Sequence, residues 1–541
     1  MPSSLVDIFD HFAAVLASDA AVCGGSCEGD ISCLTWKELK EKSLAIAVQV
    51  ATELAVAERR VELVALLAKR SPLWLAATVG VLRCRLPFVW MSAGELPLKS
   101  RHVEVDRNAE IMRTLGPGLV IIGGAVPDEV VPDWHHGDLQ PRLMHLAAAT
   151  LSGGAPLTAE GLREAVETDT LCYMLTGGTT GASKCVRVTH AMALHEVAAY
   201  PQVASQLGAR DRVLQHTPVL WAASALGQLD IALAFGATIC VSQSADQDTV
   251  LLHQATVLGL VPSSLEALEP QALPCVRCVF TWGEAMSSVI RKRWRGGGVT
   301  VLELLISTEY WLSFVSDGTT SLDGRTIYRA VKGTDFAVLP PDSGEGLSQE
   351  AGVSGELCIR GPMVTAGYEF AGRDMENANF IAAADSGGPF FRTSDLVRLV
   401  SEGRGAVSGI EFCGRSDQLV KVAGQFVDLT AAEARLREAL GVEVNADANA
   451  VRDAAAEVAI VPVPGATPPA AAGTGPPPAA HAFIASGTGS LTAEATVSLL
   501  RAVRAALPRG AALHFVHSPL PRDPVTGKVD RRTLLAGLVG L

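Results

Sequence analysis

The stretch Y-M-L-T-G-G-T-T-G-A-S-K-C, residues 173–185, combines the residue types with which proteins grip phosphate. Glycine lets the backbone approach an anion closely, threonine supplies hydroxyl donors, and lysine adds a positive charge. Ser183 precedes the lysine where a Walker A loop requires glycine, which argues against a P-loop ATPase. On composition alone, a plain turn is the alternative interpretation. The candidate phosphate ligands are Thr176, Gly177, Gly178, Thr179, Thr180, Gly181 and Lys184.

The elements that must position this loop are predicted from the hydrophobic pattern. Short apolar runs such as V-E-L-V-A-L-L-A and A-T-I-C-V alternate with longer Ala- and Leu-rich segments of helical period, which is typical of parallel sheets covered by helices. Residues 355–430 change to short β-branched runs broken by glycine, and they predict antiparallel strands. Residues 417–541 predict a separate α+β unit, in which the Pro/Ala-rich stretch 461–481 is a flexible insertion between two strands.

Composition and charge narrow the class of protein. At 541 residues the chain is too long for one compact core, so two or more folded units are expected. The net charge of −13 leaves no basic field for nucleic acid. No apolar run reaches the ~18 residues of a membrane helix. The first basic residue is Lys37, which fits neither a secretory signal nor a transit peptide. We therefore expect a soluble, cytoplasmic protein with neither a nucleic-acid nor a membrane partner.

The cysteines indicate a reducing compartment. There are 11 of them, spread along the chain without the dense framework of a small secreted domain, which favours reduced thiols. Cys275 and Cys278 form a C-x-x-C pair, but no second pair follows at zinc spacing, and ordinary thiols are the favoured interpretation. Cys23, Cys27 and Cys33 lie in a glycine-rich stretch and are a weaker candidate metal site, for which the same interpretation is favoured.

Five further segments follow the loop in a fixed order. Together with it they resemble the ordered core motifs of the adenylate-forming superfamily, which includes acyl-CoA synthetases, luciferases and the adenylation domains of nonribosomal peptide synthetases. The resemblance covers about residues 34–534. The segments are L-I-S-T-E (305–309), G-E-L-C-I-R-G-P-M-V-T-A-G-Y (355–368), F-R-T-S-D-L (391–396), G-R-S-D-Q-L-V-K-V-A-G-Q-F-V-D-L (414–429) and L-P-R-D-P-V-T-G-K-V-D-R-R-T-L (520–534).

The resemblance implies a fold class and a division into domains. The fold is α/β, with a large N-terminal AMP-binding domain at residues 1–416 that contains helix-covered β-sheets and a distorted β-barrel portion. A small, mobile α+β domain follows at residues 417–541. Asp417 matches the hinge residue about which the small domain rotates in this superfamily.

The resemblance also implies how ATP and Mg²⁺ are bound. The loop at 173–185 closes over the β- and γ-phosphates, Glu309 holds Mg²⁺, and Thr308 hydrogen-bonds the α-phosphate. Asp395 offers two carboxylate oxygens to two ribose hydroxyls. Lys528 bridges the attacking carboxylate and the α-phosphate as charge builds up. Taken singly, these residues also suit a helix start, a structural pair with an arginine and a solvated turn. The remaining implied nucleotide contacts are Gly283, Glu284, Arg415 and Lys421.

Two motifs depart from the superfamily pattern. The loop reads T-G-G-T-T-G-A-S-K-C where the superfamily has T-S-G-S-T-G-x-P-K-G, so it keeps its glycines and Lys184 but lacks a proline. Leu305 stands where an aromatic ring usually lies on adenine. These departures raise a second class of function, a catalytically weakened relative that binds a nucleotide or acyl-adenylate as a regulatory module. The presence of Glu309, Asp395 and Lys528 favours the active enzyme.

The segment P-V-L-W-A-A-S-A-L-G-Q-L-D, residues 218–230, argues against an ordinary α-amino acid as substrate. An alanine stands where amino-acid-activating relatives place an aspartate, and a buried ammonium without a counter-charge costs several kcal/mol. The bulk of Trp282 predicts a short, apolar pocket for a small acid. The alternative substrate is a β- or ω-amino acid, such as β-alanine, whose amino group would meet Asp230 or Glu303. By alignment to the superfamily the pocket residues are Ala222, Ala223, Ser263, Phe280, Trp282, Leu304, Leu312 and Ser313.

The favoured function is that of an AMP-forming acid–thiol ligase. A small carboxylic acid and ATP give acyl-AMP and pyrophosphate, and a thiol then takes the acyl group. Little sequence follows the lysine motif, so we expect the acceptor thiol to come from another molecule. Coenzyme A and the phosphopantetheine arm of a separate carrier protein are both open as acceptors.

Overall fold

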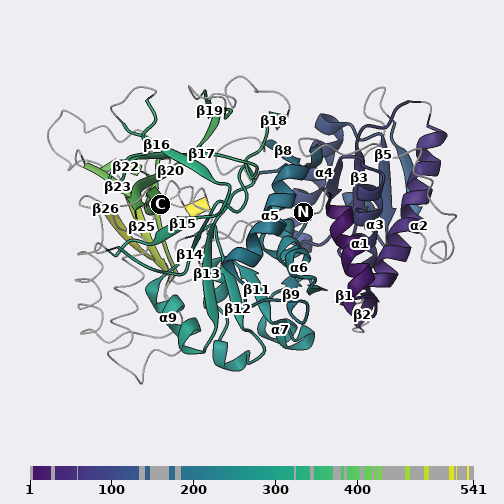
Figure 1. Cartoon of the computed structure of the whole chain (residues 1–541), viewed down its shortest axis with the longest axis horizontal. Helices are drawn as coiled ribbons and strands as arrows, with labels where there is room; N and C mark the ends of the chain where they lie inside the picture. Colours follow the sequence, from purple (N-terminus) through teal and green to yellow (C-terminus); the bar gives the residue numbers. More distant parts are fainter. Residues whose placement is uncertain are drawn as a thin grey trace.

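Two large β-sheets with packed helices form most of the described molecule (Figure 1). Most strands of the smaller of these sheets, including β3 and β5, are purple to blue and lie on the right of Figure 1, whereas most strands of the larger sheet are teal to green and lie to their left. None of the helices in the described ranges combines the length and apolar character that a membrane crossing requires. The computed structural model describes residues 4–25, 31–57, 59–132, 140–146, 170–176, 184–284, 286–321, 324–341, 346–369, 379–382, 387–401, 407–416, 419–422, 425–428, 457–462, 480–485, 511–516, 520 and 533–534.

The first sheet is built around β3, which pairs in parallel with β4 and β5. Every residue of β3 is buried, as an apolar run covered on both faces requires. At the other edge β7, β8 and β18 pair antiparallel. In the described residues the strand order is β18–β8–β7–β4–β3–β5–β6. The bounds are β3 (Val64–Ala68), β4 (Phe88–Met91), β5 (Leu119–Gly123), β6 (Arg142–Leu146), β7 (Thr170–Leu175), β8 (Cys185–Thr189) and β18 (Tyr368–Glu369).

The second sheet joins a parallel half to an antiparallel half. In the described residues its order is β16–β17–β20–β21–β15–β14–β13–β12–β11–β9–β10–β1–β2, with β19 beside β20. Strands β13 to β1 in this order are parallel. The bounds are β1 (Ala20–Gly25), β2 (Ile31–Thr35), β9 (Arg212–Gln215), β10 (Thr238–Val241), β11 (Val257–Leu260), β12 (Cys278–Thr281), β13 (Thr300–Leu305), β14 (Phe314–Ser316), β15 (Ile327–Ala330), β16 (Asp335–Leu339), β17 (Ser354–Arg360), β19 (Phe380–Ile381), β20 (Phe390–Ser401) and β21 (Val407–Arg415).

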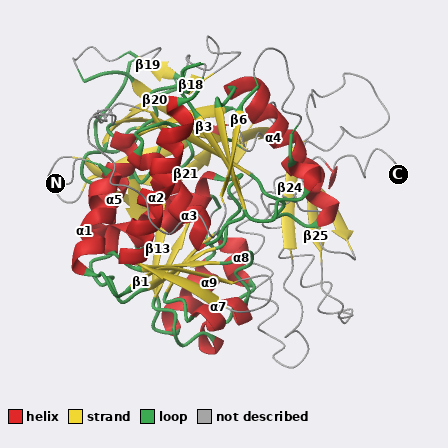
Figure 2. Cartoon of the chain, turned by 90° about the vertical axis from the view of Figure 1, so that its right-hand side faces the viewer, coloured by secondary structure: helices red, strands yellow, loops and turns green. Residues whose placement is uncertain are grey.

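Several helices begin at recognisable capping residues. Thr35 and Glu38 form a reciprocal capping box at the start of α2, and the Ser71 side chain caps α3. Helix α3 is almost wholly buried because it contacts β3 of the first sheet and β1 of the second (Figure 2). The bounds are α1 (Leu5–Val15), α2 (Trp36–Ala55), α3 (Pro72–Arg83), α4 (Arg101–Leu115), α5 (His190–Val203), α6 (Asp230–Phe235), α7 (Gln247–His253), α8 (Pro262–Glu266) and α9 (Ser288–Gly296), with short helical turns η1 (Leu98–Ser100), η2 (Asp128–Val130), η5 (Ala222–Ser224), η6 (Ala225–Leu229) and η7 (Pro270–Ala272).

The fold class predicted from the sequence is confirmed. Parallel strands with packed helices form the cores of both sheets, and the 355–430 region contains antiparallel strands, including β17, β20 and β21. The antiparallel half is the part expected to form a distorted barrel. In the described strands its ladder runs from β13 to an edge at β16. These strands carry the carboxylates discussed below.

The described residues after 416 form two small sheets. Strands β24 and β25 are antiparallel neighbours, and the predicted Pro/Ala-rich insertion falls between them in the sequence. Residues 463–479, which make up most of that insertion, lie outside the described residues. The division at residue 417 stays a prediction. The bounds are β22 (Leu419–Val422), β23 (Gln425–Asp428), β24 (Glu457–Pro462), β25 (Ala480–Ala485) and β26 (Ala511–Val516).

One cysteine prediction is wrong. Cys23 and Cys33, expected to be reduced thiols, form a disulfide. They are directly opposite each other in the antiparallel β1–β2 pair, which brings the two sulfur atoms together. Cys275 and Cys278 are free thiols, as the sequence predicted, while Cys27 lies outside the described residues. Within the described part of the chain no group of three or more His, Cys, Asp or Glu side chains is arranged to hold a metal ion.

Candidate active site

The glycine- and threonine-rich loop is closed at its base by two hydrogen bonds. The Thr176 N–H donates to the Lys184 carbonyl at 2.8 Å, and the Lys184 N–H donates to Thr176 Oγ1 at 3.2 Å. Arg107 on α4 donates from Nη1 to the Thr176 carbonyl at 3.3 Å. The antiparallel strands β7 and β8 therefore hold the two ends of the loop together. Residues 177–183, which include Gly177, Gly178, Thr179, Thr180 and Gly181, lie outside the described residues.

Lys184 is connected to Glu309 through Tyr368. The Lys184 Nζ atom lies 5.0 Å from the centre of the Tyr368 ring, a cation–π contact. The Tyr368 hydroxyl donates to Glu309 Oε1 at 3.1 Å. This contact depends on the pairing of β18 with β8, which places Tyr368 opposite Val186. The predicted phosphate lysine thus lies over the face of the Tyr368 ring, and the predicted metal carboxylate accepts from its hydroxyl group.

Glu309 is fixed in place without neutralisation of its charge. Its Oε2 accepts from the Ser307 hydroxyl at 3.1 Å, and its carbonyl accepts from the Thr365 N–H at 2.8 Å. Among the described residues, neutral hydroxyl groups hold its carboxylate, and no arginine or lysine forms an ion pair with it. Carboxylate oxygen with remaining lone pairs is the ligand that Mg²⁺ prefers. The residues present therefore fit a magnesium ion here.

Asp395 is a buried carboxylate that contacts a tyrosine and an arginine. Its Oδ2 accepts from the Tyr310 hydroxyl at 2.7 Å, and its Oδ1 accepts from Arg415 Nη1 at 2.9 Å. Asp395 on β20 and Arg415 on β21 are directly opposite in register, which explains their contact. Burial and the Asp395 charge raise the pKa of Tyr310 well above its usual range, so the phenol remains a donor. The structural Asp–Arg pair considered from the sequence is therefore present.

The structure brings five predicted nucleotide residues into one region. Four of them come from separate elements: Lys184 directly precedes β8, Glu309 follows β13, Asp395 lies in β20 and Arg415 ends β21. Thr308 is the half-buried neighbour of Glu309. Gly283, with φ of +78°, and Glu284 follow β12, and Glu284 Oε2 accepts from the Ser263 N–H at 3.1 Å. Lys421 lies in β22. Asp417 and Lys528 lie outside the described residues.

Sequence reasoning missed three residues of this site. Tyr310, Tyr368 and Ser307 supply the hydroxyl groups that hold the two carboxylates. Two of them had a signal in the sequence, because Tyr310 directly follows Glu309 and Tyr368 ends the quoted motif T-A-G-Y. Their roles depend on strands that are distant in sequence, so the motifs alone did not define them.

Trp282 fits into a notch made by two glycines. A Cβ added to Gly227 would lie 2.5 Å from Cζ3 of the Trp282 ring, and one added to Gly259 would lie 2.8 Å from its Cη2. Gly227 has φ of +74°, which independently favours glycine. The indole therefore occupies the space that side chains at positions 227 and 259 would otherwise take.

The other predicted pocket residues divide into two groups. Ala222 lines a narrow surface hollow with Trp90, Arg107, Tyr173 and Trp221 among its walls. Ala223 and Ser263 are half-buried. The remaining residues are packed in the core, where the Phe280 ring meets Tyr200 edge-on at 5.6 Å. These buried residues are Phe280, Leu304, Leu312 and Ser313.

The two carboxylates considered as partners of an amino group are already engaged. Asp230 accepts backbone hydrogen bonds from Gly227, Gln228 and Ile231 at 2.7–3.0 Å. Glu303 forms an ion pair with Arg291, whose Nε lies 2.8 Å from Oε1. Neither carboxylate needs a ligand to satisfy it.

A further buried carboxyl, Glu196 on α5, contacts the backbone of Leu312, one of the predicted pocket residues. Its Oε2 accepts from the Leu312 N–H at 2.7 Å, while its neighbour His195 contacts the Leu312 carbonyl through Nε2 at 3.1 Å. Glu196 also lies in contact with Asp230 and Tyr200. Burial, followed by the Asp230 charge, raises the pKa of Glu196 well above its usual range. Burial and the neighbouring charge of Asp230 therefore both favour the protonated form of Glu196.

We expect Glu196→Gln to become more stable than the wild type as pH rises. The folded-state pKa lies above the unfolded value of about 4.5, so the native protein binds more protons and loses stability as pH increases above that value. The slope is at most about 1.4 kcal/mol per pH unit for one proton. The amide keeps the acceptor for Leu312 and removes this titration. Denaturant unfolding between pH 5 and 8, with exposed Glu350→Gln as control, measures the effect. Parallel stability curves for Glu196→Gln and wild type would contradict it.

Comparison with known proteins identifies the family. The described geometry defines a mixed α/β protein in which antiparallel strands and a glycine-rich loop gather a lysine, two carboxylates and an arginine. The sequence matches the family model "AMP-binding enzyme" over residues 9–369. The chain belongs to the AMP-binding enzyme family. This confirms the resemblance to the adenylate-forming superfamily.

Individual relatives are distant and longer. The nonribosomal peptide synthetase imqB of Aspergillus flavus is 26% identical over 469 residues, which cover 83% of this chain and 13% of that protein. The chain spans between 5% and 34% of the length of the curated relatives it matches.

Solved structures share the whole fold. NpsA of Klebsiella oxytoca, in complex with 3-hydroxyanthranilyl-AMSN, has a TM-score of 0.71 at 18% identity, with 100% of both chains covered. ATP-bound MatB of Rhodopseudomonas palustris has a TM-score of 0.72 at 17% identity, with 98% of both chains covered. At this level of identity the likeness establishes the fold.

Proposed function

We propose that this chain uses ATP and Mg²⁺ to convert a small carboxylic acid to an acyl-adenylate and then passes the acyl group to a thiol. A carboxylate oxygen of the acid attacks the α-phosphorus, and the bond to the β-phosphate oxygen breaks with release of pyrophosphate. The thiol sulfur then attacks the acyl carbon, and AMP leaves. The thiol is that of coenzyme A or of a carrier-protein phosphopantetheine.

The observation that carries this proposal is the continuous series of contacts from the phosphate loop to Asp395. Lys184 contacts Tyr368, Tyr368 donates to Glu309, and the adjacent Tyr310 donates to Asp395. Such a series provides a cation for the terminal phosphates, a carboxylate for Mg²⁺ and a carboxylate for ribose hydroxyls. Family membership supports the same assignment. The two-domain division at residue 417 belongs to this proposal.

The choice of a small acid rests on the pocket segment. Trp282 fills the notch of Gly227 and Gly259, which removes volume from the predicted acyl pocket. Ala222 and Ala223 offer no counter-charge for an α-ammonium, and the nearby carboxylate Asp230 is satisfied by backbone donors. An acid without an amino group therefore suits the segment better than an amino acid.

A panel of acids tests the proposal. Each acid is assayed for exchange of labelled pyrophosphate into ATP, and then for thioester formation with coenzyme A and with a phosphopantetheinylated carrier protein. Exchange with a small acid and transfer to one of the thiols are expected. Binding of ATP without exchange for any acid would instead support the regulatory module and overturn the enzyme assignment.

We expect Trp282→Gly to shift preference toward longer acids. Removal of the indole opens the notch, and pockets discriminate single methylenes by about 10-fold or more. The ratio of kcat/KM for a longer acid to that for the preferred wild-type acid should rise by at least about 10-fold. Trp282→Leu is the second variant, because loss of a buried Trp costs about 3–5 kcal/mol in stability. An unchanged chain-length optimum in a folded variant would remove Trp282 from the pocket wall.

A further inference from the structure

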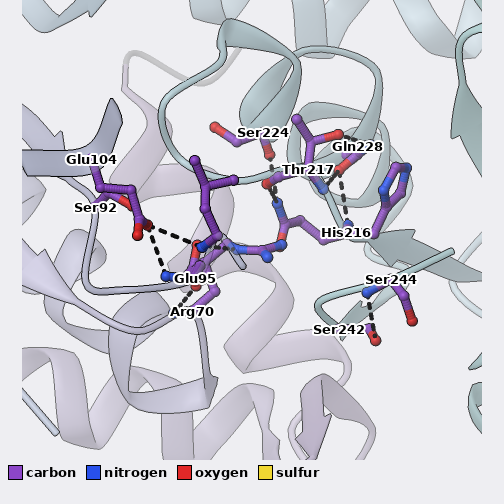
Figure 3. A network of polar contacts seen from close by, with 12 residues as sticks. Arg70, Ser92, Glu95, Glu104, His216, Thr217, Ser224, Gln228, Ser242 and Ser244 are labelled. Atoms are coloured by element: carbon purple, nitrogen blue, oxygen red, sulfur yellow. Dashed lines mark hydrogen bonds and ion pairs between the residues drawn. The ribbon is translucent and has the colours of Figure 1, made fainter. Parts of the chain in front are cut away.

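A buried arginine joins the two large sheets. Arg70, just after β3, pairs with Glu95, its N–H donating to Oε1 and its Nε to Oε2 at 2.8 Å each. Both side chains are 1% exposed. The Arg70 Nη1 atom then donates to Gln215 Oε1 at 3.1 Å, across 145 positions of sequence. Gln215 ends β9, so this hydrogen bond links the carboxyl ends of strands from different sheets. Figure 3 shows Arg70 and Glu95 on one side of this network and Ser224 and Gln228 on the other.

Gln215 connects Arg70 to the predicted pocket segment at residues 216–230. Because Arg70 occupies its carbonyl oxygen, the amide nitrogen faces the other way. It donates to the Thr217 carbonyl at 2.9 Å and to the Ser224 carbonyl at 3.3 Å. These two carbonyls flank the stretch that contains Ala222 and Ala223.

Gln228 fastens the same segment from its other end. Its Oε1 accepts from the backbone N–H groups of His216 and Thr217 at 3.1 and 3.2 Å. Its Nε2 donates to Thr217 Oγ1 at 2.8 Å and to the Gly259 carbonyl at 3.0 Å. All hydrogen-bonding positions of the amide are used, and Gln228 is fully buried. The segment is thereby tied to β11 beside the notch that holds Trp282.

His216 adds a second contact to β11. Its Nε2 lies 3.2 Å from the Gly259 carbonyl, which can only accept. Desolvation lowers the pKa of His216 to about 4, so the ring is neutral at physiological pH and carries its proton on Nε2. A neutral ring avoids a second positive charge close to Arg70.

The segment needs these side-chain contacts because its own backbone is irregular. Between residues 222 and 229 the chain passes from a 3₁₀ turn to a π-type turn, and Leu226 and Gly227 have non-helical angles. Such a segment makes fewer regular hydrogen bonds than a helix or strand, so fixed side-chain partners decide its position. Outside this segment, Glu104 accepts from the N–H groups of Glu95 and Leu96, at 2.8 and 3.2 Å. It thereby fixes Glu95, the ion-pair partner of Arg70.

We propose that Gln215 and Gln228, oriented by Arg70, form an amide clamp that positions the 216–230 segment and thereby sets the acyl pocket. They are positioning residues, since neither is assigned to the nucleotide. The pocket role rests on the proposed function, whereas the clamp itself rests on the contacts above.

Hydrogen–deuterium exchange tests the clamp directly. In Gln215→Met and Gln228→Met, amides of the 216–230 peptide should exchange at least about 10-fold faster than in the wild type, while β3 and α3 peptides are unchanged. Gln202→Met is the matched control, because Gln202 is exposed and, among the described residues, its side chain donates within α5 to the Ala198 carbonyl. Should Gln228→Met fail to fold, Gln215→Met decides, since it leaves the Arg70–Glu95 pair intact. Wild-type exchange in the folded variant would overturn the proposal.

Steady-state kinetics test the pocket role. The KM for the acid should rise by about 10-fold or more in the clamp variants, with the KM for ATP within about twofold of the wild-type value. An equal rise of both KM values would show that the clamp does not act on the acyl pocket. If none of the acids supports pyrophosphate exchange by the wild type, the proposed function fails. Hydrogen–deuterium exchange of the 216–230 amides still decides whether the clamp exists.

Discussion

Lys528→Ala should abolish formation of the acyl-adenylate and leave thioester formation from a supplied acyl-adenylate within severalfold of the wild-type rate. In the proposed function the Lys528 ammonium would stabilise charge that develops at the α-phosphate only during the first half-reaction. Loss of one such group typically costs a factor of about 10²–10³ or more. The measurement compares pyrophosphate exchange with conversion of synthetic acyl-AMP to thioester.

The control and the reciprocal variant make this test decisive. Lys332→Ala, an exposed lysine after β15, should leave both half-reactions unchanged. Asp417→Pro stiffens the predicted hinge and should slow thioester formation more than adenylation, if the small domain rotates between the two reactions. Equal loss of both half-reactions in folded Lys528→Ala would contradict a mechanism in which the small domain rotates between the two reactions.

Glu309→Gln should lower adenylation by about two to three orders of magnitude, which corresponds to about 3–4 kcal/mol of transition-state stabilisation. The substitution removes the negative charge of the carboxylate that we propose as the Mg²⁺ ligand. It preserves an oxygen that can accept from the Tyr368 hydroxyl, so the fold should survive. Pyrophosphate exchange as a function of Mg²⁺ concentration measures the effect.

Two further variants separate the metal role from a structural one. Glu309→Asp retains the charge and should recover part of the activity with a raised requirement for Mg²⁺. Tyr368→Phe removes the hydroxyl donor to Glu309 and keeps the ring under Lys184, so it should have a smaller effect than Glu309→Gln. Near wild-type exchange in folded Glu309→Gln would remove Glu309 from the metal site.

The predictable parts of the fold were those with short-range signals. Apolar runs such as V-A-L-L-A in β3 could be recognised because a strand buried on both faces needs continuous hydrophobicity. The T-x-x-E pattern at Thr35 produced the capping box of α2 from contacts three residues apart. The change to glycine-broken β-branched runs indicated the antiparallel strands β17, β20 and β21. Each of these signals lies within one element.

The sequence predicted the main charged residues of the candidate site but not all of the contacts that hold them. The motif order named Lys184, Glu309 and Asp395, and the structure brings them into one region. The hydroxyl groups of Tyr310 and Tyr368 were missed, because their partners lie 85 and 59 positions away and are met only through strand pairing. The cross-strand disulfide was missed for a similar reason, since the β1–β2 register, and not the spacing of the cysteines, sets it.

The sequence by itself determined which residue types and which secondary-structure periods the chain has, and therefore its fold class and its family. The tertiary structure decided which distant groups meet: Arg70 with Gln215, Trp282 with the glycines at 227 and 259, and Lys184 with Tyr368. The physical reason is that periodicity and capping act through neighbours in the chain. A hydrogen bond or packing contact between sheets depends instead on strand order, register and the volume left by every other side chain.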